Sequence, residues 1–376
     1  MSWDGLGIAA TVLTGLPAIP LAVIWVFSLI HNRQYKDPAR RGAGWVKGAI
    51  PVFFLALVVE TVGRIYNILA YYGFLNARSA YPAYVSLFVG QLAALMVFIA
   101  FVETGLGFLH VHGRNFVAVL PAAAGGDSEK TIRPKSHVAT RIGTYSMALV
   151  LFALAAASFG LRVRGFYEYY GWYASYYYYD DADDIYAQTI TRFQQAIKLN
   201  AAFDIICWIL TMPLIGFAGY VVSRCRGSVV AQTSHIYVAA ACVWFARFFW
   251  LLIYQCGYAL PEYSNLDEAA IVIVDPLMSL WFFMIVLILL FVIFAKKQTG
   301  LWSIGRPWMA YQAQPPYAPP ANFGYDYGSG APAPFYGAPP PQANERQLHE
   351  MHQTPSPIYT TTAVSGVSTP PVQGKA

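Results

Sequence analysis

Seven long apolar runs separated by short polar segments dominate the chain up to about residue 300. A membrane-spanning helix needs roughly 20 mostly apolar residues, because its backbone must satisfy its own hydrogen bonds in lipid. None of the runs alternates apolar and polar residues as the strands of a membrane β-barrel do. The pattern therefore predicts an all-α, polytopic membrane protein, a seven-transmembrane-helix bundle. Its spans are expected near 6–30, 46–72, 83–109, 138–161, 199–222, 235–258 and 269–295.

The composition excludes an ordinary soluble fold. Of the 376 residues, 57% are hydrophobic and 11% are charged, whereas about 25% of an average soluble domain is charged. The first run has no basic residue before it, so we expect an uncleaved membrane anchor and not a signal peptide. Its Pro17 and Pro20 predict a kinked helix whose freed carbonyl groups are covered by neighbouring helices.

The distribution of Lys and Arg predicts how the bundle is oriented. Cytoplasmic loops retain positive charge, and fifteen Lys and Arg residues flank the runs on one side against five on the other. We therefore expect the amino terminus outside and the carboxyl terminus in the cytoplasm, with the plasma membrane as the location. The longest exterior connection, about 163–197, is rich in Tyr and Asp. It is either a recognition surface for sugar or lipid headgroups or an aromatic belt at headgroup level.

From residue 303 the composition changes to Pro, Gly, Ala, Tyr, Ser and Gln. Such a segment cannot bury enough apolar surface to fold, so 303–376 is expected to be a disordered cytoplasmic tail that can dock on a cytoplasmic adaptor. Thr354, Ser356 and Thr369 each precede a proline and are candidate phosphorylation sites; an unregulated spacer is the alternative. Cys225 lies between two arginines beside a span, a position that suits palmitoylation.

Ionisable side chains inside the predicted spans are the strongest candidates for function, because charge in a membrane is costly. These residues are Glu60, Arg64, Glu103, Asp204, Arg247 and Asp275. Helical spacing places Glu60, Arg64 and Asn67 on one face of the second helix. All of these except Glu103 fall near the midplane or in the exterior half. We therefore predict one polar ligand-binding cavity, open to the outside, formed by Glu60, Arg64, Asn67, Asp204, Arg247 and Asp275.

The alternative is that the same charges only hold the bundle together. Glu60 and Arg64 are one helical turn apart and can pair within their helix, and Arg247 can pair with Asp204 or Asp275. Both interpretations predict that Arg247→Leu damages folding, because an acid is left without its counter-charge.

Motifs of enzymes and cofactor-binding proteins are missing. Five of the seven histidines lie at the cytoplasmic ends of spans without the spacing of metal ligands. The seventh span has no lysine for a retinal Schiff base, and no P-loop or hydrolase motif occurs. We therefore expect no enzyme, no cofactor, no metal and no nucleic acid. The expected partners are membrane lipids and a lipid-like or other small-molecule ligand.

Three stretches resemble fungal seven-helix membrane proteins, including the RTA-like lipid-translocating exporters. Trp244-Phe-Ala-Arg247 resembles the arginine of that family's sixth helix, and Ile273-Val-Asp275-Pro-Leu-Met278 its seventh-helix Asp and Met. Val59-Glu-Thr-Val-Gly-Arg64 is similar to the second-helix Glu and Gly. In this chain no Phe precedes Asp275 and no Glu follows Arg247. The resemblance implies a non-enzymatic protein that binds and translocates an amphipathic lipid. A seven-helix sensor or receptor signalling through loops and tail, and a structural membrane organiser, are the alternatives.

Overall fold

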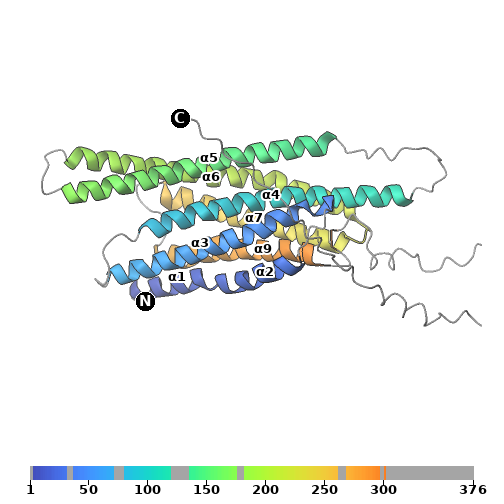
Figure 1. Ribbon diagram of the computed structural model, residues 1–376, viewed down its shortest axis with the longest axis horizontal. Coiled ribbons are helices and arrows are strands. Elements are labelled where there is room, and N and C mark those ends of the chain that lie inside the picture. Colours follow the sequence, from blue (N-terminus) through green and yellow to red (C-terminus); the bar gives the residue numbers. More distant parts are fainter. Residues whose placement is uncertain are drawn as a thin grey trace, which may run out of the picture. The chain divides into compact units, whose positions relative to one another are not determined.

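The computed structural model describes residues 3–31, 37–71, 80–119, 135–175, 182–260, 268–296 and 300–301 (Figure 1). The chain divides into two units, Met1–Pro315 and Pro316–Ala376. The predicted tail 303–376, with its candidate phosphorylation sites Thr354, Ser356 and Thr369, lies outside the described residues. Within the described ranges the regular structure is helical throughout and contains no strand.

The helices follow the order expected for a bundle. They are α1 Trp3–Gly15, α2 Ala18–His31, the short 3₁₀ helix η1 Pro38–Arg40, α3 Arg41–Tyr71, α4 Ala80–Val119, α5 Lys135–Ser175, α6 Ala182–Cys225, α7 Ala231–Tyr254, η2 Gln255–Ala259, α8 Glu268–Asp275, η3 Pro276–Trp281 and α9 Phe282–Ala295. Seven helical stretches in the described ranges are long and apolar enough to cross a membrane. The predicted fold class is confirmed, and the chain is an integral membrane protein.

The first span is broken at the predicted prolines. α1 ends at Gly15 and α2 begins at Ala18, because Pro17 has no N–H to donate to the carbonyl of Leu13. The indole Nε1 of Trp281 donates to that carbonyl at 3.0 Å. The first span is therefore interrupted as expected, and the seventh span covers the carbonyl group that Pro17 leaves free.

The stretch 163–197, expected to be a long exterior loop, is helical for most of its length. Residues 163–175 continue α5, and residues 182–197 form the beginning of α6. The Tyr and Asp run at 176–181 lies outside the described residues, so both interpretations of it stay predictions. At the left of Figure 1 the paired ends of α5 and α6 extend beyond the end of α3.

Polar and aromatic contacts explain why α5 and α6 continue past the apolar runs. Glu168 of α5 pairs with Arg164 one turn earlier at 3.0 Å and with Arg192 of α6. Phe166 packs edge-on against Tyr81 of α4, with ring centroids 4.2 Å apart. In the sequence these side chains are typical of a loop, yet in the bundle they pair between neighbouring helices and stabilise them.

Aromatic side chains connect several helices in the core of the bundle. Phe53 of α3 stacks on Phe283 of α9 with centroids 3.9 Å apart, and Trp244 of α7 meets the same Phe283 ring edge-on at 5.2 Å. The buried hydroxyl of Tyr237 donates to the Phe101 carbonyl at 2.9 Å. These contacts join α3, α4, α7 and α9 and border the site described below.

The sixth and seventh spans each contain a π-helical segment, η2 and η3. Such segments are rare and often mark functional sites. The segment η3 begins at Pro276, directly after Asp275, where the missing N–H interrupts the α-helical hydrogen bonds. Both segments border the same cavity, because Gln255, Asp275 and Ser279 line it.

Candidate ligand-binding cavity

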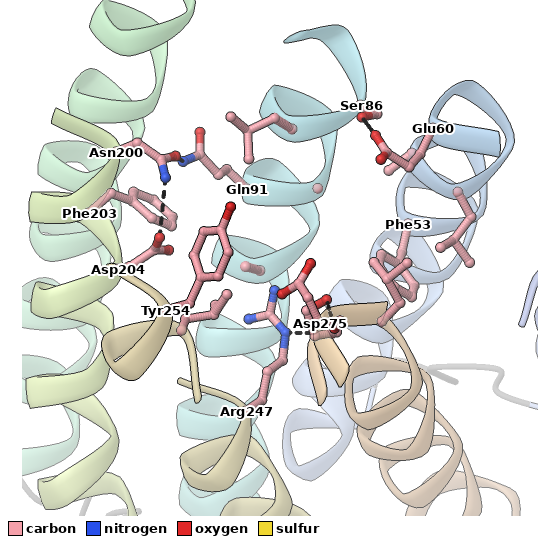
Figure 2. A pocket seen from close by; sticks show the side chains of 18 of the residues that line it. Phe53, Glu60, Ser86, Gln91, Asn200, Phe203, Asp204, Arg247, Tyr254 and Asp275 are labelled. Atoms are coloured by element: carbon pink, nitrogen blue, oxygen red, sulfur yellow. Dashed lines mark hydrogen bonds between the residues drawn. The ribbon is translucent and has the colours of Figure 1, made fainter. Parts of the chain in front are cut away.

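A cavity of about 350 Å³ lies between α3, α4, α6, α7 and the seventh span (Figure 2). Five of the six residues proposed from the sequence line it. These residues are Glu60, Arg64, Asp204, Arg247 and Asp275. They come from four segments that are far apart in the sequence, so the bundle gathers these acids and arginines around one space.

Two other residues singled out from the sequence do not line this cavity. Asn67 is exposed on α3, about 10 Å along the helix axis from Glu60 at 1.5 Å per residue. Glu103 is 3% exposed and pairs with Arg141 of α5 at 3.0 Å. Glu103 therefore joins α4 to α5 outside the cavity.

Cys225 does not suit the predicted palmitoylation. It ends α6 with an exposed fraction of 0%. Its carbonyl accepts from the Ser228 hydroxyl at 2.6 Å, and Gly227 turns the chain with a φ of 81°. The turn leaves the Cys225 thiol in the core, where an attached acyl chain has no room.

One wall of the cavity is a chain of buried polar side chains from α4, α6 and η2. Gln91 Nε2 donates to Asn200 Oδ1 at 2.8 Å. Asn200 Nδ2 and Gln255 Nε2 both donate to Asp204 Oδ2, at 3.3 Å and 2.7 Å. Figure 2 shows Gln91 of α4 opposite Asn200 of α6, with Asp204 on the same helix as Asn200. The Asp204 carboxyl group is thus held by neutral donors.

A second polar group lies between α3 and α4. Arg64 Nε pairs with Glu60 Oε1 at 3.1 Å, one helical turn away. The Ser86 hydroxyl donates to Glu60 Oε2 at 2.5 Å. The pairing of Glu60 with Arg64 that the sequence allows is therefore present, and both residues still line the cavity.

The contacts of Arg247 differ from the pairing with Asp204 or Asp275 that the sequence suggested as an alternative. Its Nε donates to the Ser279 carbonyl at 2.9 Å, and its guanidinium lies 4.8 to 5.1 Å from the ring centres of Trp244, Phe248 and Phe283. Within the described ranges it forms no ion pair with an aspartate, and its buried Nη1 has no hydrogen-bond partner. The negative faces of three rings surround its charge instead.

Asp275 also binds a neutral donor. Its Oδ1 accepts from the Trp250 indole at 3.2 Å, and its main-chain carbonyl accepts from the Ser279 hydroxyl at 2.5 Å. Asp275 thus joins α7 to the seventh span without an arginine partner in the described structure.

The remaining lining of the cavity is largely apolar. It includes Phe53, Leu57, Leu87, Phe203, Leu251 and Leu280. At Gly90 an added Cβ atom would meet no atom within 4 Å, so the space beside α4 is open. The cavity therefore offers charged and apolar surfaces to one occupant.

Neutral polar residues are the part of the site that the sequence analysis missed. Ser86, Gln91 and Gln255 line the cavity, but their types alone do not separate them from other neutral polar residues in the apolar runs. The feature that could have identified them in the sequence is a carboxamide or hydroxyl group inside a span, because such a group needs a hydrogen-bond partner there.

Comparison with models of protein families, with curated proteins and with solved structures finds no match to this chain. The chemistry of the cavity is therefore the guide to function.

Proposed function

We propose that this integral membrane protein binds an amphipathic, lipid-like molecule in the cavity and moves it across the membrane. The main observation behind the proposal is that the cavity is lined by both polar and apolar side chains. Glu60, Arg64 and Asp204 provide a polar surface, and Leu57 and Leu280 belong to an apolar one. An amphipathic molecule presents both kinds of surface. Pockets for small ligands likewise combine mostly apolar walls with a few placed polar groups.

The volume of the cavity limits how much of the ligand it can hold. A volume of about 350 Å³ lies at the lower end of the roughly 300–1,000 Å³ range of ligand pockets. It suits a headgroup with the first part of an apolar chain. The remaining chain would extend between helices into lipid.

The π-helical segments favour a second candidate, a sensor or receptor. A ligand in contact with Gln255 or Ser279 touches η2 or η3 directly. Irregular helical segments often mark functional hinges, so binding there would change the ends of the sixth and seventh spans. A purely structural organiser has no need of the cavity.

A transport assay tests the proposal. A fluorescent amphiphile should redistribute between leaflets in vesicles containing the protein, and Asp204→Asn combined with Asp275→Asn should stop it while expression is retained. Asn67→Ala is the control, since Asn67 is an exposed polar residue of the same bundle. Equal redistribution with and without the protein would refute transport.

Deleting 303–376 separates the two candidates. Transport through the cavity should survive the deletion, whereas signalling through the tail should be lost. The orientation proposed from basic residues, with the carboxyl terminus cytoplasmic in the plasma membrane, is tested by the accessibility of a tag on residue 376 in intact cells.

A further inference from the structure

The Asp204 carboxyl group is buried without a positive partner. Asp204 is 7% exposed, and both of its hydrogen bonds, from Asn200 and Gln255, end on Oδ2. In the described part of the chain both hydrogen bonds to this carboxyl group reach Oδ2 and none reaches Oδ1, and no ion pair reaches either oxygen. Oδ1 is not among the fully buried atoms without a partner, and Asp204 lines the cavity, so Oδ1 is accessible there. An ionised carboxylate buried in this way is unfavourable.

Gln255, which donates to Asp204, has a side-chain oxygen that lacks a hydrogen-bond donor in the described structure. It is 2% exposed, and its Oε1 is buried with no hydrogen-bond partner among the described residues. Its Nε2 already donates to Asp204 at 2.7 Å. A buried acceptor without a donor is unfavourable for the same reason as a buried charge without a partner. The two oxygens that lack a donor therefore belong to side chains that are already joined.

Two arginines act electrostatically on Asp204, but neither forms an ion pair with it. Arg247 of α7 binds the Ser279 carbonyl at 2.9 Å. Arg162 of α5 lies over the Tyr84 ring at 5.7 Å. These contacts of the two arginines are made to other groups, and Arg162 Nε and Arg247 Nη1 are buried without a hydrogen-bond partner among the described residues.

The other titratable neighbours do not supply a positive partner either. Asp275 of α8 acts on Asp204 as a like charge, and Cys207 lies on the same helix as Asp204. Arg64 of α3, which lines the same cavity, is paired with Glu60. The unsatisfied oxygens of Asp204 and Gln255 therefore remain.

We propose that Asp204 is a proton-binding site, in which a proton on Oδ1 is donated to Gln255 Oε1. The two side chains then form a cyclic acid–amide pair with one N–H and one O–H donor. The proton comes from water in the cavity and returns to water on release, leaving the carboxylate. This single proton satisfies both oxygens.

The site has a structural consequence at the end of α7. Gln255 is the first residue of η2, so release of the proton removes the proposed second hydrogen bond between this segment and Asp204 of α6, and leaves the one from Gln255 Nε2. Proton occupancy is thereby linked to the shape of the cavity. The proposal does not depend on which molecule the cavity binds.

Infrared difference spectra test the site directly. The full chain in lipid nanodiscs, compared at acidic and alkaline pH, should show the C=O band of a protonated carboxyl group. Asp204→Asn should lose the band and Asp275→Asn should keep it. Gln255→Leu, which leaves Asp204 in place, should shift the band because the acid loses its acceptor. A band that survives in Asp204→Asn would overturn the proposal.

Thermal unfolding gives a second readout. The bound proton completes its hydrogen bond only in the folded protein, so its loss at alkaline pH should lower the unfolding temperature of the wild type. In Asp204→Asn an amide N–H replaces the acid O–H, and this dependence should disappear. Stability that responds to Na⁺ and not to pH would contradict a proton site. Neither readout uses an amphiphile, so failure of transport would leave the result intact.

Discussion

The Nε of Arg247 donates to the main-chain carbonyl of Ser279, 2.9 Å away, and not to Asp204 or Asp275. This bond joins the sixth span to the π-helical segment of the seventh. The guanidinium group thus supports the wall of the cavity while its Nη1 stays without a hydrogen-bond partner in the described structure.

Replacing Arg247 by Leu should destabilise the protein. The change removes a hydrogen bond from a charged donor, worth about 1.5–3 kcal/mol, and three ring contacts. Thermal unfolding in detergent measures the loss. Arg247→Lys should recover only part of it, because an ammonium group cannot stack as a planar guanidinium does. Equal stability of all three proteins would contradict this account.

Filling the cavity at Gly90 should block ligand binding without unfolding the protein. The space beside Gly90 is open, and Leu favours a helix by roughly 0.5–1 kcal/mol relative to Gly. Gly143→Leu is a matched control, because Gly143 is an exposed helical glycine with equally open surroundings. Amphiphile binding should fall in Gly90→Leu and persist in Gly143→Leu, with both variants folded.

The Glu103–Arg141 pair should contribute to stability and not to binding. Glu103 is buried, so Arg141→Leu leaves a buried acid without its partner. Breaking a fully buried pair costs about 3–5 kcal/mol, and the partial exposure of Arg141, 27%, lowers the expected cost. Adding Glu103→Gln should restore much of the stability. A double-mutant cycle in thermal unfolding checks the coupling.

Close packing of η1 against α4 should make Gly107 intolerant of substitution. A Cβ atom there would lie 2.2 Å from the Ala39 carbonyl oxygen. Gly107→Ala should therefore destabilise the bundle by about 1–3 kcal/mol, as overpacking does. Gly216→Ala, where no atom lies within 4 Å, should not. A Gly107→Ala variant as stable as Gly216→Ala would contradict the close contact with Ala39, because Ala favours a helix over Gly at both positions.

Cysteine labelling should separate buried from exposed thiols. Cys242 and Cys256 are exposed, whereas Cys207 and Cys225 are buried. A small membrane-permeant maleimide should label the first two in the folded protein and all four after unfolding. Acyl-exchange chemistry should find no palmitate on Cys225; its detection would show that the α6 end opens.

The apolar runs predicted the helices because lipid leaves a spanning chain few other structures. Charged residues in those runs were informative for a related reason: Asp204 and Asp275 must face the protein interior, so they converge. The partner Gln255 could not be predicted, because it reaches Asp204 from a π-helical segment. The continuation of α5 past its apolar run depends on Glu168 and Arg192, which belong to different helices.

The hydrogen bond between Trp281 and Leu13 gives the first span a role in the cavity's behaviour. Trp281 is the last residue of η3, and the main-chain carbonyl of Ser279 in the same segment accepts a hydrogen bond from Arg247. Straightening η3 would withdraw the indole and leave the Leu13 carbonyl bare in a membrane. A fluorophore attached to the first span would therefore report rearrangements of the seventh span without touching the ligand site.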